Sequence, residues 1–190
     1  TANGDVLITG NSNTITSNAG KVWMSGKSST VTNANGGDIY LTGNTSTVTN
    51  ANGGRIFITG HTATLATAQG TVNITGKQNT ITTASATVNI SGGTNTVTTA
   101  NGKVVMTGGA NTVTTANGTV YASGINTITT ASNRVSMSGI NTITTANSTV
   151  LVTGHANTVS SNAGKVWMSG ATSTVTNANG GKIYLTGNSS

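Results

Sequence analysis

The residues that could do acid–base or metal chemistry are few and widely separated in this chain. The only carboxylate side chains are Asp5 and Asp38, and the only imidazoles are His61 and His155. General acid–base catalysis needs titratable groups within reach of one substrate, and a metal site needs several converging ligands. The chain has no Cys, which excludes thiolate metal sites and disulfides. We therefore predict no catalytic residue, no metal and no cofactor, and a protein that is not an enzyme.

Threonine offers a different kind of candidate site, because the pattern Thr-x-Thr recurs along the whole chain. Within a strand, residues i and i+2 project to the same side at about 6.5–7 Å, and stacked strands lie about 4.8 Å apart. The pattern therefore predicts a flat lattice of hydroxyl and methyl groups without any charge. The intact pairs are Thr14 with Thr16, Thr30 with Thr32, Thr47 with Thr49, Thr80 with Thr82, Thr96 with Thr98, Thr112 with Thr114, Thr127 with Thr129, Thr142 with Thr144, and Thr174 with Thr176.

Large apolar side chains recur at a second outward position, on the strand opposite the threonines. Exposed apolar clusters usually mark contacts with other molecules, so we predict a contact patch for lateral bundling or surface attachment. The alternative is tolerated scatter of apolar residues on a hydrated face. The patch consists of Trp23, Tyr40, Phe57, Tyr121, Trp167 and Tyr184.

A short internal repeat must position these residues. A glycine preceded by Thr or Ser recurs from Gly10 to Gly187 in steps of 15 to 17 residues. Such a short period is typical of a solenoid with one coil per repeat. We predict an all-β fold, a single β-solenoid of about twelve coils with parallel, in-register stacking. The repeat leaves the handedness of the coil open.

One coil, residues 103–118, shows how the repeat is built. Val104–Thr107 alternates as a strand does, Gly108 ends it, and Asn111–Thr114 is a second strand with Val113 inward. Val, Ile and Thr favour strands, whereas Gly and Asn favour turns. Repetition gives three inward columns of apolar residues, which run from Val6 to Ile183, from Ile8 to Leu185 and from Ile15 to Val175.

A fourth column is polar and lies just before the second strand. Stacked Asn side chains can hydrogen-bond from coil to coil, as they do in cross-β ladders, and the alternative is a plain turn preference of Asn. The two 15-residue steps place Ile125 and Ile140 beside this column, and we expect both to pack into the shortened corner. The column contains Asn13, Asn79, Asn95, Asn111, Asn126, Asn141 and Asn157, with Ser or Ala elsewhere.

Charge is sparse and does not point to an anionic partner. The net charge is +6 and the pI is near 10.1, but the eight basic residues are spread along the chain, so we expect no nucleic-acid partner. No segment is long and apolar enough to predict a membrane span. Asp5, Lys21, Asp38 and Arg55 alternate in sign in one column and predict a small surface salt ladder.

A second, longer repeat suggests how the chain is organised. Residues 1–46 match residues 145–190 without a gap at roughly three quarters of the positions, and the offset is 161 − 17 = 144 residues. We therefore divide the single solenoid 1–190 into one nine-coil block, residues 1–144, and the start of the next, residues 145–190. No capping segment is recognisable, so we expect a portion of a longer fibre or a unit that stacks end to end.

These patterns favour a non-enzymatic structural segment of an extracellular or cell-surface fibre or adhesin stalk, which associates with itself head to tail and laterally. The Thr-x-Thr face also resembles that of the insect hyperactive antifreeze solenoids. The Gly-x-x-Asn-Thr-Val spacing resembles the plant ice-recrystallisation-inhibition repeats. These resemblances imply, as the alternative, an ice-binding protein whose two threonine columns contact ice. The insect proteins carry a disulfide framework that this chain lacks.

Overall fold

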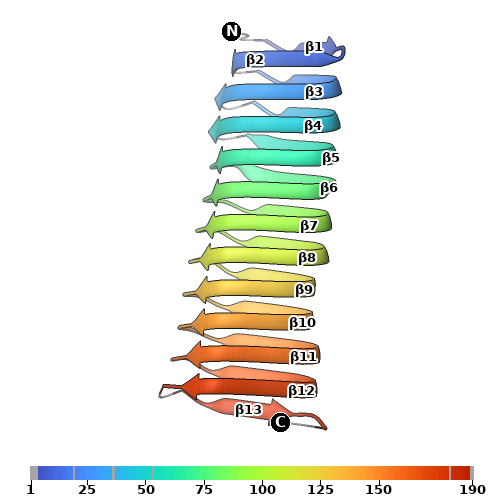
Figure 1. The fold of residues 1–190 in the computed structure, drawn as a ribbon. Coiled ribbons are helices and arrows are strands. Elements are labelled where there is room, and N and C mark those ends of the chain that lie inside the picture. Colours follow the sequence, from blue (N-terminus) through green and yellow to red (C-terminus); the bar gives the residue numbers. More distant parts are fainter. Residues whose placement is uncertain (1–3, 19, 36, 53, 180, 189–190) are drawn as a thin grey trace.

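Thirteen β-strands lie side by side in the computed structural model and form one parallel sheet that winds around a single axis (Figure 1). The structure describes residues 4–18, 20–35, 37–52, 54–179 and 181–188. None of these residues is helical, and no helix long and apolar enough to cross a membrane occurs among them. The strands are β1 (Val6–Thr9), β2 (Ser12–Asn18), β3 (Val22–Asn35), β4 (Ile39–Asn52), β5 (Arg55–Ala68), β6 (Thr71–Ala84), β7 (Val88–Ala100), β8 (Val104–Ala116), β9 (Val120–Ala131), β10 (Val135–Ala146), β11 (Val150–Asn162), β12 (Val166–Ala178) and β13 (Ile183–Thr186).

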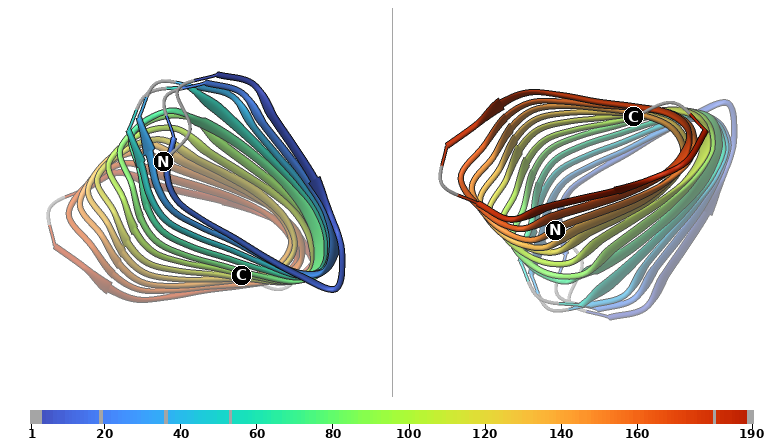
Figure 2. Two further views of the ribbon diagram at one scale, coloured as in Figure 1. Left: turned by 90° about the horizontal axis from the view of Figure 1, so that it is seen from above. Right: turned by 90° about the horizontal axis from the view of Figure 1, so that it is seen from below.

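Each of the long strands β3 to β12 follows most of one coil, whereas β1 and β2 share a coil and β13 begins the last one. Neighbouring coils pair in parallel between equivalent residues, for example Val97 with Val113 and Thr96 with Thr112. The predicted all-β solenoid with in-register stacking is therefore confirmed. Seen along the axis, successive coils are rotated gradually relative to one another, as the twist of β-strands requires (Figure 2).

The three predicted apolar columns fill the interior of the coil. Almost all of their members are buried, including Val113. Val6, Ile8, Val175 and Leu185, which have a paired coil on one side only, are partly buried against the others. Burial of one such side chain contributes about 1.5–3 kcal/mol, so a narrow core repeated in every coil is sufficient to hold the fold.

Glycine closes the corner between the two strand segments of each coil. The two shortened corners have the most unusual backbone, with φ of 124° at Gly124 and 112° at Gly139, a region that residues with a Cβ rarely adopt. A Cβ added at Gly139 would also collide with the carbonyl oxygen of Gly124 in the preceding coil. The shortening by one residue is thus possible because both corners carry glycine.

The predicted asparagine ladder is present and lies inside the coil. From Asn79 to Asn157, each Nδ2 donates to Oδ1 of the Asn in the next coil at 2.7–2.8 Å. Each amide also donates to a carbonyl at the corner of that next coil, as Asn111 does to Ser123 at 2.8 Å. All six side chains are buried, and these bonds satisfy their polar atoms except Oδ1 of Asn79, which has no partner in the protein.

The fully buried Val97 and its exposed neighbour Thr98 provide a test of the inward and outward positions. Val97→Asp would place an unpaired charge in the narrow core and should lower the free energy of unfolding by several kcal/mol. Thr98→Asp should lower it much less, because its carboxylate stays in water. The measurement is chemical unfolding followed by circular dichroism, and equal midpoints for the two variants would contradict the assignment.

Candidate functional site

The threonine lattice is the first surface feature that could bind a ligand, and its first column is aligned directly from coil to coil. Thr80, Thr96, Thr112 and Thr127, for example, are strand partners in succession. The alignment continues without a break from one end of the column to the other. None of its threonines is buried, and those of the intact pairs are Thr14, Thr30, Thr47, Thr80, Thr96, Thr112, Thr127, Thr142 and Thr174.

The second column also lies on the surface, but its threonines are not themselves strand partners. In each coil the alignment passes from the residue before the threonine to the residue after it, as from Val97 with Val113 to Thr99 with Thr115. Thr98 and Thr114 therefore occupy equivalent positions on adjacent coils, because the residues on either side of them are paired in the same register. The half-buried members of this column are Thr32 and Thr49, and the exposed members are Thr16, Thr82, Thr98, Thr114, Thr129, Thr144 and Thr176.

The structure thus places all eighteen predicted threonines outward, in nine pairs, but aligns the two columns differently. Of these two columns, only the first has its threonines paired directly with each other from coil to coil. No charged side chain interrupts either column. The first column is therefore the more regular half of the predicted lattice, a difference that the Thr-x-Thr pattern alone did not reveal.

Two isoleucines border this lattice, contrary to our expectation. Ile125 and Ile140 were expected to pack into the shortened corner, but 55% and 46% of their surfaces are exposed. Each isoleucine directly follows the corner glycine and precedes an inward Asn, so strand alternation turns its side chain outward. The two residues are paired with each other on adjacent coils and flanked by Ala110 and Ala156. The result is a short apolar ridge beside the threonine columns.

The predicted contact patch is divided into stacked groups. The rings of Trp23 and Tyr40 are 5.5 Å apart and nearly parallel, and those of Tyr40 and Phe57 are 4.9 Å apart. All three side chains are half-buried. Because each ring covers the face of the next, the stack stabilises the coils and leaves mainly ring edges for a partner. Such contacts contribute about 0.5–1.5 kcal/mol beyond the area they bury.

The other members of the patch are arranged differently. Trp167 stacks on Tyr184 at 5.4 Å, and both rings are exposed, at 36% and 46% of their surfaces. Tyr121 stands apart from both stacks, with the ammonium group of Lys103 at 5.4 Å from its ring centre. The structure thus places all six predicted residues in one outward column but brings only five of them together, in two separate stacks, and leaves Tyr121 apart.

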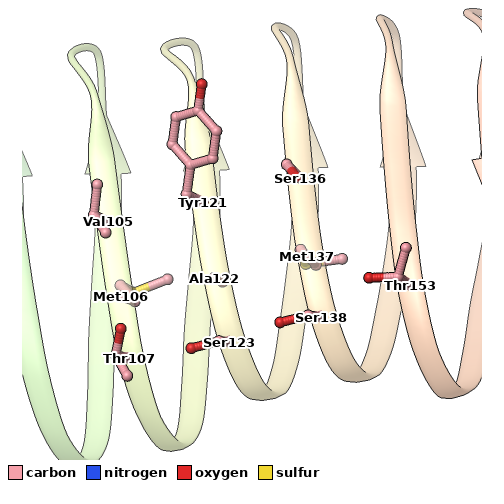
Figure 3. Close-up of a pocket in the computed structure, with 10 residues that line it drawn as sticks. All are labelled: Val105, Met106, Thr107, Tyr121, Ala122, Ser123, Ser136, Met137, Ser138 and Thr153. Atoms are coloured by element: carbon pink, nitrogen blue, oxygen red, sulfur yellow. The ribbon is translucent and has the colours of Figure 1, made fainter.

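Between the two stacks the same face is hollowed. A shallow depression of about 230 Å³ spans β8 to β11, where the outward side chain of Ser136 is smaller than that of its strand partner Tyr121 (Figure 3). A second depression of about 210 Å³ adjoins it and shares Val105 and Thr107. Hydroxyl groups line both, and Tyr121 is the only titratable residue in either lining. Sequence analysis did not anticipate this hollow, because it depends on the sizes of side chains in neighbouring coils.

The candidate chemical residues lie apart on the surface. His61 and His155 are exposed and lie on different coils, β5 and β11. Asp5 accepts a hydrogen bond from the backbone N–H of Lys21 at 3.3 Å. Within the described ranges, no group of three or more His, Asp or other metal-ligating side chains comes together.

The alternating charges form one ion pair rather than a continuous ladder in the described part of the chain. Nη2 of Arg55 lies 2.6 Å from Oδ2 of Asp38, and the hydroxyl of Tyr40 donates to the same oxygen at 3.4 Å. The hydrogen bond from the Arg55 guanidinium holds the pKa of Asp38 below its ordinary value. The same bond raises the pKa of Arg55.

These features define the class of the protein as a parallel β-solenoid with regular outward columns. No protein-family model, no curated protein and no solved structure matches the chain. The fold class therefore rests on the repeat and on the coil geometry described above.

The Asp38–Arg55 pair should make stability depend on pH. Because the pKa of Asp38 is lowered in the folded state, its contribution is present above the unfolded pKa and is lost as pH falls through the folded pKa. We expect Asp38→Asn to be slightly less stable than the parent protein at neutral pH, and the difference should disappear in acid. Urea unfolding of both proteins across this range is the measurement, and a difference that persists below the folded pKa would contradict the assignment.

Proposed function

We propose that the chain is a non-enzymatic structural segment of an extracellular or cell-surface fibre or adhesin stalk. The observation that carries this proposal is the junction between the two sequence blocks, which meet between residues 144 and 145. Here β10 of the first block pairs with β11 of the second in parallel, from Val135 with Val150 to Ala146 with Asn162. The junction has one shift of register, between Ser138 and Ile140, and otherwise resembles the pairing within a block.

This junction supports axial continuation because the second block repeats the first. The coil that follows it begins with β11, and residues 145–160 align with residues 1–16. In a chain with further blocks, the last coil of each block would therefore meet a first coil like the one that β10 already contacts. Such a contact does not close on itself and gives filaments.

The mechanical character of the fold also favours a structural role. Hydrogen bonds between parallel strands run from coil to coil, along the axis, so that tension on the fibre would load many of them together. The core columns and the asparagine ladder follow the same direction.

Axial association is tested by electron microscopy and light scattering of the purified chain at rising concentration. We expect elongated particles whose axial repeat is the length of one chain, about twelve coils at about 4.8 Å each, or roughly 58 Å. A species that stays monomeric at high concentration, from a gene that encodes no further blocks, would contradict the proposal. The double variant Trp23→Ser, Trp167→Ser tests the lateral contact, and it should reduce bundling while axial particles persist. Tyr121→Ser is the control, because Tyr121 belongs to neither stack, and it should change neither property.

A second candidate function is ice binding through the threonine lattice. The observation that favours it is the unbroken alignment of uncharged threonines in the first column, which would hold an ordered layer of water over a long, gradually twisting surface. Ile125 and Ile140 add an apolar edge on two neighbouring coils. The combination of methyl and hydroxyl groups on this surface agrees with the resemblance of its Thr-x-Thr face to that of the antifreeze solenoids.

Ice binding is tested by measuring thermal hysteresis and crystal shaping. If the lattice contacts ice, Thr112→Tyr should abolish both effects, because the bulky ring would lift the flat surface off the crystal. Thr107→Tyr is the matched control, since Thr107 lies on the outer side of the opposite strand segment of β8 and is also exposed. Loss of hysteresis in both variants, or hysteresis that survives Thr112→Tyr, would exclude this surface as the contact.

A further inference from the structure

The asparagine ladder is interrupted in three successive coils. Between Asn13 and Asn79, the same inward position is occupied by Ser29, Ser46 and Ala63. These residues are paired in register from coil to coil, so they continue the column. All three are buried, with 1%, 0% and 1% of their surfaces exposed. We call these three positions, which are stacked on successive coils and not contiguous in the sequence, the Ser–Ser–Ala segment.

This segment leaves polar atoms without partners inside the coil. The hydroxyl oxygens of Ser29 and Ser46 have no hydrogen-bond partner in the protein. The same is true of Oδ1 of Asn79, the atom that would accept the amide of an Asn at position 63. An unsatisfied buried polar group is destabilising, and such groups are rare in folded proteins.

The missing side-chain group has the size and bonding capacity of water. Ser and Ala lack the carboxamide that each Asn of the ladder carries, and that amide both donates and accepts. A buried water typically makes about 3 hydrogen bonds and takes about 30 Å³ of liquid volume. Two hydroxyls and one amide oxygen offer neutral partners, and no charged side chain belongs to the column, which favours water over a cation.

The same situation recurs one block later. Ser173 lies 144 residues after Ser29, at the equivalent position of β12. It is also buried, and its hydroxyl oxygen likewise has no partner in the protein. The surrounding sequence is nearly the same in both blocks, so the same packing leaves the hydroxyl without a protein partner at both positions.

We propose that the Ser–Ser–Ala segment binds a short row of internal water molecules that continues the asparagine ladder. The row accepts hydrogen bonds from the hydroxyls of Ser29 and Ser46 and donates one to Oδ1 of Asn79. The hydroxyl of Ser173 offers the same kind of donor in β12. The solenoid interior thus alternates between coils joined by amides and coils joined by water, and this holds whether the outer faces serve a fibre or bind ice.

The test counts long-lived internal waters by oxygen-17 magnetic relaxation dispersion on the whole chain. The triple variant Ser29→Asn, Ser46→Asn, Ala63→Asn supplies the three amides, so the count should fall and the unfolding midpoint should rise. The matched control adds three Asn on the adjoining outward positions, as Thr30→Asn, Thr47→Asn and Thr64→Asn, and should leave the count unchanged. An equal count in the parent protein and the inward variant would overturn the proposal.

A single smaller change keeps the test decisive if the triple variant does not fold. If water is bound, Ser46→Ala removes one of its partners, so the count of long-lived waters and the unfolding midpoint should both fall. If the site is dry, the same change deletes an unsatisfied hydroxyl, so the midpoint should rise with no change in the count. The second result would overturn the proposal.

Discussion

The close approach of successive coils at their glycine corners is the constraint on which the rest of this structure depends. A Cβ at Gly26 would collide with the carbonyl oxygen of Gly10, and the same holds for the corner glycines of the following coils. Without side chains at the corner, each coil can lie directly on the preceding one and start its second segment at the equivalent residue. The register then survives coil lengths from 15 to 17 residues. Every column, inward or outward, follows from that alignment.

Two stacking systems hold the coils together, and they largely alternate along the axis. The inner amide ladder joins the coils of β6 to β11, from Asn79 to Asn157. The outer aromatic stack joins β3 to β5 through Trp23, Tyr40 and Phe57, which are the coils where the inner column has Ser or Ala. Tyr121 is the exception, because its coil carries an aromatic ring and an Asn.

The sequence was sufficient to predict the fold because the period aligns equivalent residues. A residue such as Val113 has the same role as its neighbours above and below, so alternation within one coil determined the inward and outward columns for all of them. The asparagine ladder followed from the same alignment. The prediction was wrong for Ile125 and Ile140, where the loss of a corner residue suggested packing and strand alternation turned both side chains outward. The aromatic stacks and the hollow near Ala122 were not predicted, since both depend on how side chains of different size meet across coils.

The asparagine ladder also gives the solenoid a sense of direction. In every rung from Asn79 onward, Nδ2 points toward the higher-numbered coil and Oδ1 toward the lower-numbered one. The amide dipoles therefore add along the axis instead of cancelling, so that one end of the row presents an acceptor and the other a donor. The acceptor end of the row lies at Asn79, next to Ala63, and the donor end lies at Asn157, next to Ser173. The two directions along the axis of the solenoid are therefore chemically distinct inside the coil as well as in the backbone.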